Sequence, residues 1–97
     1  MALATTSDRD LGHAAAVGRA LGDPKRLCVL ERLLAGEASV GELSQTIGCQ
    51  VPNMSQHLAV LRNAGLVTTR REGSTVYYRL ADERIRDIYR LLASLAD

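Results

Sequence analysis

Two short helical segments joined by three residues constrain the fold of this chain more than any other feature. The first segment, residues 39–47, begins with Ser39 and Glu42 at the spacing of a capping box, which starts a helix. Residues 48–50, Gly-Cys-Gln, then read as a tight turn, and a second helical pattern follows in residues 51–64. A short helix, a three-residue turn containing glycine and a second helix together predict a helix-turn-helix.

The second helical segment has two faces of different chemistry. Met54, Leu58 and Leu61 recur at positions i, i+4 and i+7, which places them on one side of a helix. The other side carries small, amide-bearing or basic residues, of which only one is charged: Pro52, Asn53, Ser55, Gln56, Arg62 and Asn63. Such a face is a poor general solubiliser, but its amides and hydroxyl can form hydrogen bonds with the edges of bases.

Two β-rich runs follow the helix-turn-helix. Residues 66–71 and 75–81 are joined by Glu72-Gly73-Ser74, which is a hairpin signal. The second run alternates, so we expect one buried and one exposed face. Its inward set is Val76, Tyr78 and Leu80, and its outward set is Tyr77 and Arg79. A helix-turn-helix followed by a hairpin predicts a winged helix, a fold that is mainly α with one small β-hairpin.

Further helices are expected on either side of this unit. Residues 9–22 are rich in alanine, and Asp23-Pro24 has the form of a helix start before residues 25–35. Asp82 begins a final segment with apolar residues at helical spacing. The first and last helices offer more apolar surface than a small core can cover, so we expect them to form a dimer interface. The alternative is that they pad the core of the monomer.

Length and composition restrict the class of protein. A chain of 97 residues with 46% hydrophobic content allows one domain, residues 9–97, after a flexible N-terminus at residues 1–8. The net charge is only +1, so the basic footprint of a nucleic-acid partner has to be local. No apolar run approaches the roughly 20 residues of a membrane span, and no signal peptide is recognisable. Two cysteines without an export signal favour reduced thiols and a cytoplasmic location.

From about Leu21 to Leu95 the chain resembles the ArsR/SmtB family of small dimeric winged-helix repressors. The resemblance rests on four landmarks in the right order, LGDPKRLCVLERLLAGE, SVGELSQTIG, PNMSQHLAVLRNAGLV and REGSTVYYRL. It implies a homodimer that occupies a double-stranded DNA operator and leaves it when an inducer arrives. Inducers in the family are metal ions, metalloids, or oxidants and reactive sulfur that act on thiols.

The resemblance assigns the polar face of the second helix to DNA. We expect Ser55 and Gln56 to read base edges, because the family inserts the N-terminal half of this helix deepest. Pro52 and Asn53 are expected to line the place where this helix enters the groove of the DNA. Gln50 lies at the helix start, where free backbone N–H groups favour a phosphate. For Asn53, a local cap or turn bond is the alternative.

Basic residues around the hairpin complete the predicted DNA-binding set. Between residues 60 and 80 only one acid, Glu72, opposes four basic residues, Arg62, Arg70, Arg71 and Arg79. Arg70 and Arg71 flank the hairpin tip, and we expect them to touch phosphate or a minor groove in the manner of a wing. The alternative is that the charges of this hairpin are simply solvated.

The sequence says less about what the protein senses. Both standard metal sites of the family are incomplete, because Ser39 stands in place of a cysteine, and Arg84 and Leu95 stand in place of two histidines. No metal ligand is therefore assigned. Cys28 and Cys49 are the candidate redox-sensing thiols, and modification in the turn at Cys49 would distort the helix that follows. The alternative for Cys49 is a small buried apolar residue without a function.

Other functions stay open at this point. A winged helix regulated by a metal, a small ligand or a partner protein, or one used for protein contact, is the alternative to a thiol-switched repressor. A metal-responsive version would need Cys28 or Cys49 to combine with His13 or an acid across the dimer. An enzyme is not expected, because no nucleophile–base pair, phosphate loop or carboxylate pair is recognisable. No cofactor is expected either.

Overall fold

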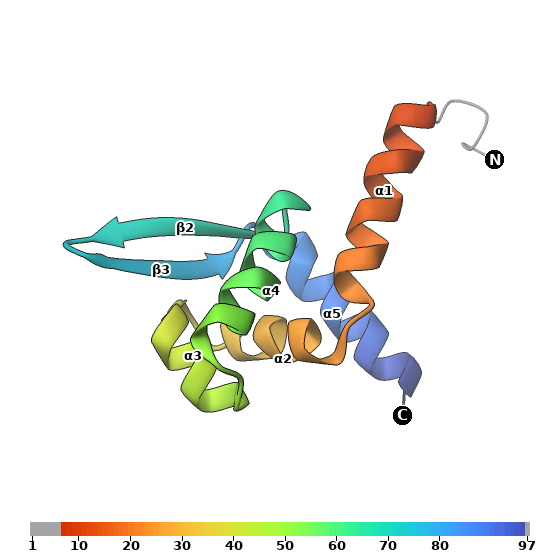
Figure 1. Ribbon diagram of the computed structural model, residues 1–97. Coiled ribbons are helices and arrows are strands. Elements are labelled where there is room, and N and C mark those ends of the chain that lie inside the picture. The colour runs from red at the N-terminus through yellow and green to blue at the C-terminus, as the bar shows by residue number, and fades with distance from the viewer. Residues whose placement is uncertain (1–6, 97) are drawn as a thin grey trace.

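The computed structural model describes residues 7–96, which form five helices and a three-stranded sheet (Figure 1). In chain order the elements are α1 (Asp8–Leu21), α2 (Pro24–Leu33), β1 (Ala38–Ser39), α3 (Val40–Ile47), α4 (Val51–Asn63), β2 (Val67–Glu72), β3 (Thr75–Leu80) and α5 (Glu83–Ala96). The predicted winged helix-turn-helix is confirmed. Residues 1–6 of the predicted flexible N-terminus lie outside the described residues, whereas Ser7 caps α1 and Asp8 is already helical.

Local capping determines where α2 and α3 begin. Asp23 caps α2 as predicted, because its carboxylate accepts hydrogen bonds from the backbone N–H groups of Lys25 (2.8 Å) and Arg26 (3.1 Å). The bond from the Arg26 N–H is the main reason why the pKa of Asp23 lies below its usual value. The predicted capping box of Ser39 and Glu42 is also formed at the start of α3.

Gly48 sets the turn between the two helices of the helix-turn-helix. Its φ of 78° lies in the left-handed region, which glycine adopts at little cost. The N–H groups of Gly48 and Cys49 both donate to the carbonyl of Ser44, at 2.9 and 3.1 Å. These bonds end α3 and redirect the chain into α4 after the three predicted turn residues.

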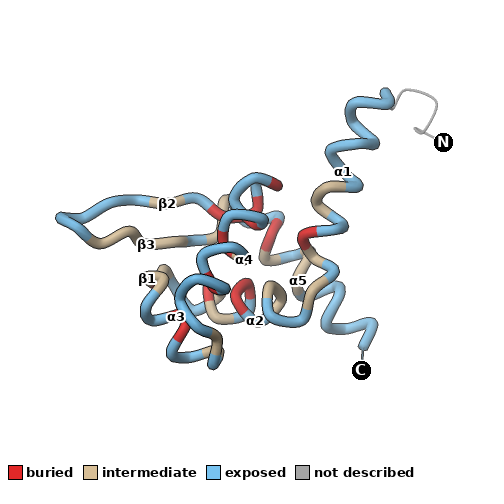
Figure 2. Tube along the Cα trace, in the orientation of Figure 1, coloured by how far each residue is buried: buried red, intermediate tan, exposed pale blue. Residues whose placement is uncertain are grey.

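The core lies where α2, α3 and α4 meet (Figure 2). Leu30 of α2, Leu43 of α3, and Met54, Leu58 and Leu61 of α4 are each 0% exposed. The predicted inward face of α4 is therefore confirmed. The start of the hairpin and the first turn of α5 extend the same cluster, so the wing and the last helix are attached to the helix-turn-helix through apolar contacts.

Leu58→Ala should lower the free energy of unfolding by about 2–5 kcal/mol, because it removes buried methyl groups and leaves a cavity between tightly packed helices. Chemical denaturation monitored by circular dichroism measures this change. Val60→Ala on the exposed side of α4 is the matched control, and its effect should stay within about 0.5 kcal/mol. Equal effects of the two substitutions would contradict the assignment of Leu58 to the core.

The sheet contains one strand more than the sequence predicted. The strand order is β1-β3-β2, and the two-residue β1 pairs antiparallel with β3. The hairpin turn is also tighter than expected, because Glu72 pairs with Thr75 and only Gly73 and Ser74 lie between the strands. A two-residue strand is too short to show a period of two, which is why the sequence pattern did not indicate β1.

The expected burial of one hairpin face is only partly correct. Val76, Tyr78 and Leu80 are half-buried rather than buried, because the hairpin projects from the body of the molecule and only its base meets the core (Figure 1). Tyr77, expected to be exposed, is half-buried as well. The guanidinium group of Arg70 lies over its ring, 4.7 Å from the centroid, and covers it.

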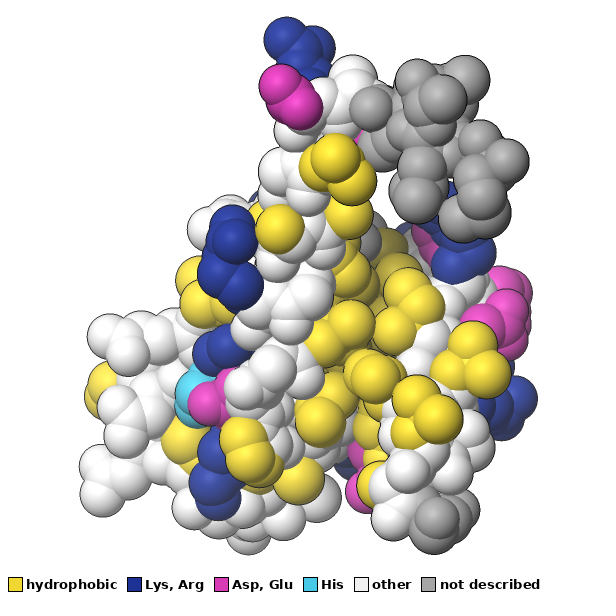
Figure 3. Space-filling view, turned by 90° about the vertical axis from the view of Figure 1, so that its right-hand side faces the viewer, with side chains coloured by type: hydrophobic (Ala, Val, Ile, Leu, Met, Phe, Trp, Pro, Cys, Tyr) yellow, Lys and Arg dark blue, Asp and Glu magenta, His cyan; other side chains and the backbone are white. Residues whose placement is uncertain are grey.

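The first and last helices leave much of their apolar surface uncovered. Ala20 is the only buried residue of α1, and Ile85 is the only buried residue of α5. Leu11, Leu91, Leu92 and Leu95 are 51%, 66%, 38% and 83% exposed. Figure 3 shows hydrophobic side chains gathered on the face that α1 and α5 share. Within residues 7–96, none of the helices is long and apolar enough to cross a membrane.

Candidate nucleic-acid interface

The outer face of α4 carries the polar residues that follow the turn of the helix-turn-helix. The structure leaves exposed every residue that the sequence assigned to this face of the helix, Pro52, Asn53, Ser55, Gln56, Arg62 and Asn63. Because the opposite face is anchored in the core, these side chains project from a rigid support. Sequence reasoning missed Val51, which is 48% exposed one turn before Ser55 and can contact a thymine methyl group. Its i, i+4 spacing to Ser55 was the available signal.

The start of α4 is open at its N-terminus. Gln50 is the N-cap residue and makes no side-chain cap hydrogen bond, so the backbone N–H groups of the first turn point outward without a cap. Pro52 contributes no N–H group, which leaves those of Val51 and Asn53 as the donors of this turn. A helix start of this kind attracts anionic groups such as phosphate.

Arg26 connects the end of α1 with α4. Its Nε donates to the carbonyl of Ala20 (2.7 Å) and its Nη2 donates to that of Arg19 (3.0 Å). Its Nη1 lies 3.4 Å from Nδ1 of His57, which accepts this contact when that nitrogen carries no proton. The half-buried His57 is thus part of the packing between α4 and α2, and α4 is held from behind by both apolar and polar contacts.

The two wing arginines have different surroundings. Arg71 is exposed, and none of the ion pairs within the described residues involves it. Arg70 belongs to a cluster that we call the wing clamp, formed by Glu37, Arg70, Glu72 and Tyr77. Arg70 Nε donates to both carboxylate oxygens of Glu37, at 3.0 and 2.8 Å, and Nη2 donates to the same carboxylate. Arg70 Nη1 donates to Glu72 at 2.7 Å.

The hydrogen bonds of the wing clamp shift the pKa values of its members. The hydrogen bonds from Arg70 hold the pKa of Glu37 below its usual value, and the same bonds, with those to Glu72, raise the pKa of Arg70. To reach a phosphate, Arg70 would have to give up both carboxylates. Sequence reasoning missed Glu37 because it lies 33 residues away from Arg70 along the chain, and no local pattern links the two positions.

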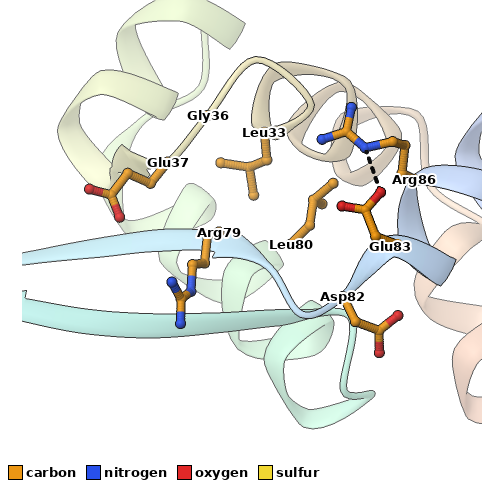
Figure 4. Close-up of a pocket in the computed structure, with 8 residues that line it drawn as sticks. All are labelled: Leu33, Gly36, Glu37, Arg79, Leu80, Asp82, Glu83 and Arg86. Carbon is orange, nitrogen blue, oxygen red and sulfur yellow. Dashed lines mark ion pairs between the residues drawn. The ribbon is translucent and has the colours of Figure 1, made fainter.

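A hollow of about 280 Å³ lies at the base of the wing, between the end of α2, β3 and α5 (Figure 4). Its acids are all paired. Glu37 pairs with Arg70, Asp82 with Arg84 at 2.8 Å, and Glu83 with Arg86 at 3.4 Å. The hollow therefore offers no unpaired carboxylate to a cation. Throughout the described residues, no three His, Cys, Asp or Glu side chains are grouped as metal ligands.

The two candidate thiols differ in exposure and in the element that carries them. Cys28 is exposed on α2 and borders a hollow of about 380 Å³ together with Glu31, Arg32 and the end of α3. Cys49 is half-buried in the turn before α4, and its Sγ donates to the carbonyl of Gln50 at 3.6 Å. Both are free thiols. Cys49 therefore touches the backbone of the N-cap residue of α4.

Comparison with known proteins finds a matching family and several relatives of this chain. Residues 23–69 match the family described as "Bacterial regulatory protein, arsR family". The HTH-type transcriptional regulator KmtR of Mycobacterium tuberculosis is 49% identical over 72 residues, which are 74% of this chain and 55% of KmtR. The transcriptional activator HlyU of Vibrio cholerae is 39% identical over 88 residues, which are 91% of this chain and 82% of HlyU. The chain spans about half the length of the first curated relatives it matches.

A solved structure has the same fold over nearly the whole chain. It is the homodimeric winged helix-turn-helix DNA-binding domain of a possible ArsR-family transcriptional regulator from Mycobacterium bovis. The two structures superpose with a TM-score of 0.86 at 37% identity, covering 94% of this chain and 87% of that chain.

Proposed function

This chain belongs to the ArsR family of bacterial regulatory proteins, a family of transcriptional regulators and not of enzymes, and we propose that it is a dimeric repressor of a specific DNA operator. The observation that carries the proposal is the exposed face of α4, where uncharged amide and hydroxyl groups project from a helix fixed in the core. A helix of this kind fits the major groove and can distinguish base pairs by their hydrogen-bond patterns.

Ser55 and Gln56 take the base-reading role in this proposal. Both are exposed one turn after the start of α4, and Gln56 can form a bidentate pair with adenine. Pro52 and Asn53 line the entry. Gln50 and the uncapped first turn of α4 bind a phosphate of the DNA backbone. This contact fixes the helix in the groove but contributes no sequence information.

Arg62 and Arg71 supply further contacts with the DNA backbone. Arg62 lies at the exposed C-terminal end of α4, and Arg71 lies near the tip of the wing. Each phosphate contact should steepen the salt dependence of binding by about one counterion. The net charge of +1 makes these local contacts important, because the chain as a whole has no strong attraction to DNA.

Two copies of the chain are proposed to associate through α1 and α5. The support is the exposed apolar surface of these helices, including Leu11, Leu91, Leu92 and Leu95, together with the homodimeric state of the related domain from M. bovis. Two α4 helices in a symmetric dimer would read two half-sites of a palindromic operator.

Release from the operator is assigned to modification of a thiol. Cys49 lies in the turn that directs α4, so a bulkier or more polar sulfur at this half-buried position would displace the start of the helix. Cys28 is the more accessible thiol. Modification would shift the population of dimers away from the form that binds DNA. Because HlyU is named an activator, repression needs a test separate from binding.

A binding isotherm tests the proposal in two steps. A labelled double-stranded fragment from upstream of the gene for this protein is titrated with reduced protein, beside an unrelated fragment of equal length. We expect clearly tighter binding to the upstream fragment, and equal binding to both would refute a specific repressor.

Treatment with hydrogen peroxide tests the thiol switch. It should weaken specific binding of the wild-type protein, and should weaken binding of Cys28→Ser or Cys49→Ser less. Unchanged binding after peroxide would refute the thiol switch, and a reporter gene measures repression.

A further inference from the structure

The wing clamp connects β2 with the segment before α3, and no strand pairing joins these two parts directly. Glu37 lies in the loop between α2 and β1, directly before the strand that leads into α3. β1 pairs with β3 and not with β2. Among the described residues, the contact between Glu37 and Arg70 is therefore the polar side-chain link between β2 and the segment that leads into the helix-turn-helix.

The strand register separates the clamp from the exposed wing arginine. Arg70 lies opposite Tyr77 on β3, and Arg71 lies opposite Val76. Side chains alternate along a strand, so Arg70 and Arg71 point to opposite faces of the hairpin. A contact that holds Arg70 to the body of the protein consequently also determines where Arg71 projects.

The contacts of Arg70 hold its side chain in one direction between β2, β3 and the loop before β1. We call a residue held in this way a brace. Its planar guanidinium group meets Glu37 through two nitrogens, meets Glu72 through the third, and stacks on the Tyr77 ring. A fork of this kind fixes direction as well as distance, which a single charge contact does not. With 41% of its side chain exposed, Arg70 lies between the solvent and the ring that it covers.

We propose that Arg70 is a positioning residue, which Glu37 holds so that the wing keeps a fixed angle to α4 and Arg71 meets the DNA backbone preorganised. This inference rests on the proposed DNA binding and replaces the predicted phosphate contact of Arg70. The two roles lead to opposite expectations for Glu37. An acid that holds a brace favours DNA binding, whereas an acid that only neutralises a phosphate contact opposes it.

Glu37→Gln separates the two roles by the sign of its effect. If Arg70 is a brace, the variant should bind operator DNA about two- to fivefold more weakly than the wild type, the size expected for an exposed ion pair. Glu83→Gln is the matched control, because it also removes one paired acid, but the partner of Glu83 is Arg86 of α5 and not a residue of the wing. Its binding should be unchanged or slightly tighter. Unchanged or tighter binding by Glu37→Gln would overturn the inference.

A charge swap provides a second comparison. Arg70→Glu alone should weaken binding, and Arg70→Glu combined with Glu37→Arg should restore part of it, because the pair is formed again with its members exchanged. A phosphate contact at position 70 would not be restored by the swap.

The salt dependence of DNA binding provides a third comparison. Arg71→Ala should lower the slope of log affinity against log salt concentration by about one counterion per subunit. Arg70→Ala should leave this slope unchanged.

Amide hydrogen exchange tests the brace without DNA. In the free protein, Glu37→Gln should accelerate exchange in the outer half of β2 relative to the wild type, while Glu83→Gln should not. Unchanged exchange in β2 would overturn the inference even if DNA binding changed. Because this readout needs no operator, failure of the brace can be distinguished from failure of the proposed DNA binding, which the wild-type isotherm tests.

Discussion

Replacing Ser55 and Gln56 together with alanine should abolish the preference of this protein for its operator over unrelated DNA. Both side chains lie on the exposed face of α4, and neither is needed by the core that holds the helix. A well-formed contact with a base edge discriminates by about 1–3 kcal/mol, and a dimer makes each contact twice. We therefore expect a loss of specific affinity on the order of 100-fold or more, measured as the ratio of dissociation constants for operator and unrelated fragments.

Gln45→Ala is the control for this experiment. Gln45 is an exposed amide on α3 and lies outside the predicted base-reading set. Loss of a sequence-independent contact there would weaken binding to both fragments equally and leave their ratio unchanged. A double variant at 55 and 56 that stays folded, as judged by circular dichroism, and keeps the wild-type ratio would show that α4 does not read the operator.

Leu92→Glu combined with Leu95→Glu should convert the dimer to monomers and weaken operator binding on the order of 100-fold or more. The two leucines lie on the exposed apolar surface of α5, where a buried carboxylate without a partner would be costly. A monomer can engage only one half-site, so the gain from linking two recognition helices is lost. Sedimentation measures the oligomeric state, and titration with operator DNA measures binding.

Arg90→Glu provides the matched comparison on the same helix. It changes the net charge by two units, as the double leucine variant does, at another exposed position of α5. We expect this control to remain dimeric. A double leucine variant that sediments as a dimer and binds operator normally would exclude this surface of α5 as the dimer interface.

Local signals explain which parts of the fold could be predicted from the sequence. The capping residues Asp23, Ser39 and Glu42 act within three positions of the groups they bind, so the helix starts were recognisable from the chain alone. The turn at residues 48–50 was equally local, because it depends on the left-handed conformation of Gly48. The inward face of α4 followed from its period.

Features that depend on distant segments were not predictable in the same way. β1 is defined by its pairing with β3, some 40 residues later, and its two residues carry no pattern of their own. Arg70 was expected to touch phosphate or a minor groove, and the only acid close to it in sequence is Glu72. The acid that holds it, Glu37, enters the site through the packing of the loop after α2. For α5, the uncovered apolar surface itself was predicted, but periodicity alone does not tell which of its apolar positions the monomer covers.

Selection of binding sites from a random pool of double-stranded DNA shows whether α4 reads a specific operator. The reduced protein is incubated with the pool, bound molecules are recovered and amplified, and the enriched sequences are aligned. A dimer that reads DNA through two α4 helices should enrich a two-fold symmetric site whose half-site centres lie about 10 base pairs, or a multiple of that, apart. The variant with alanine at positions 55 and 56 should lose this enrichment. Recovery of no common sequence by the wild-type protein would show that this protein does not bind DNA sequence-specifically.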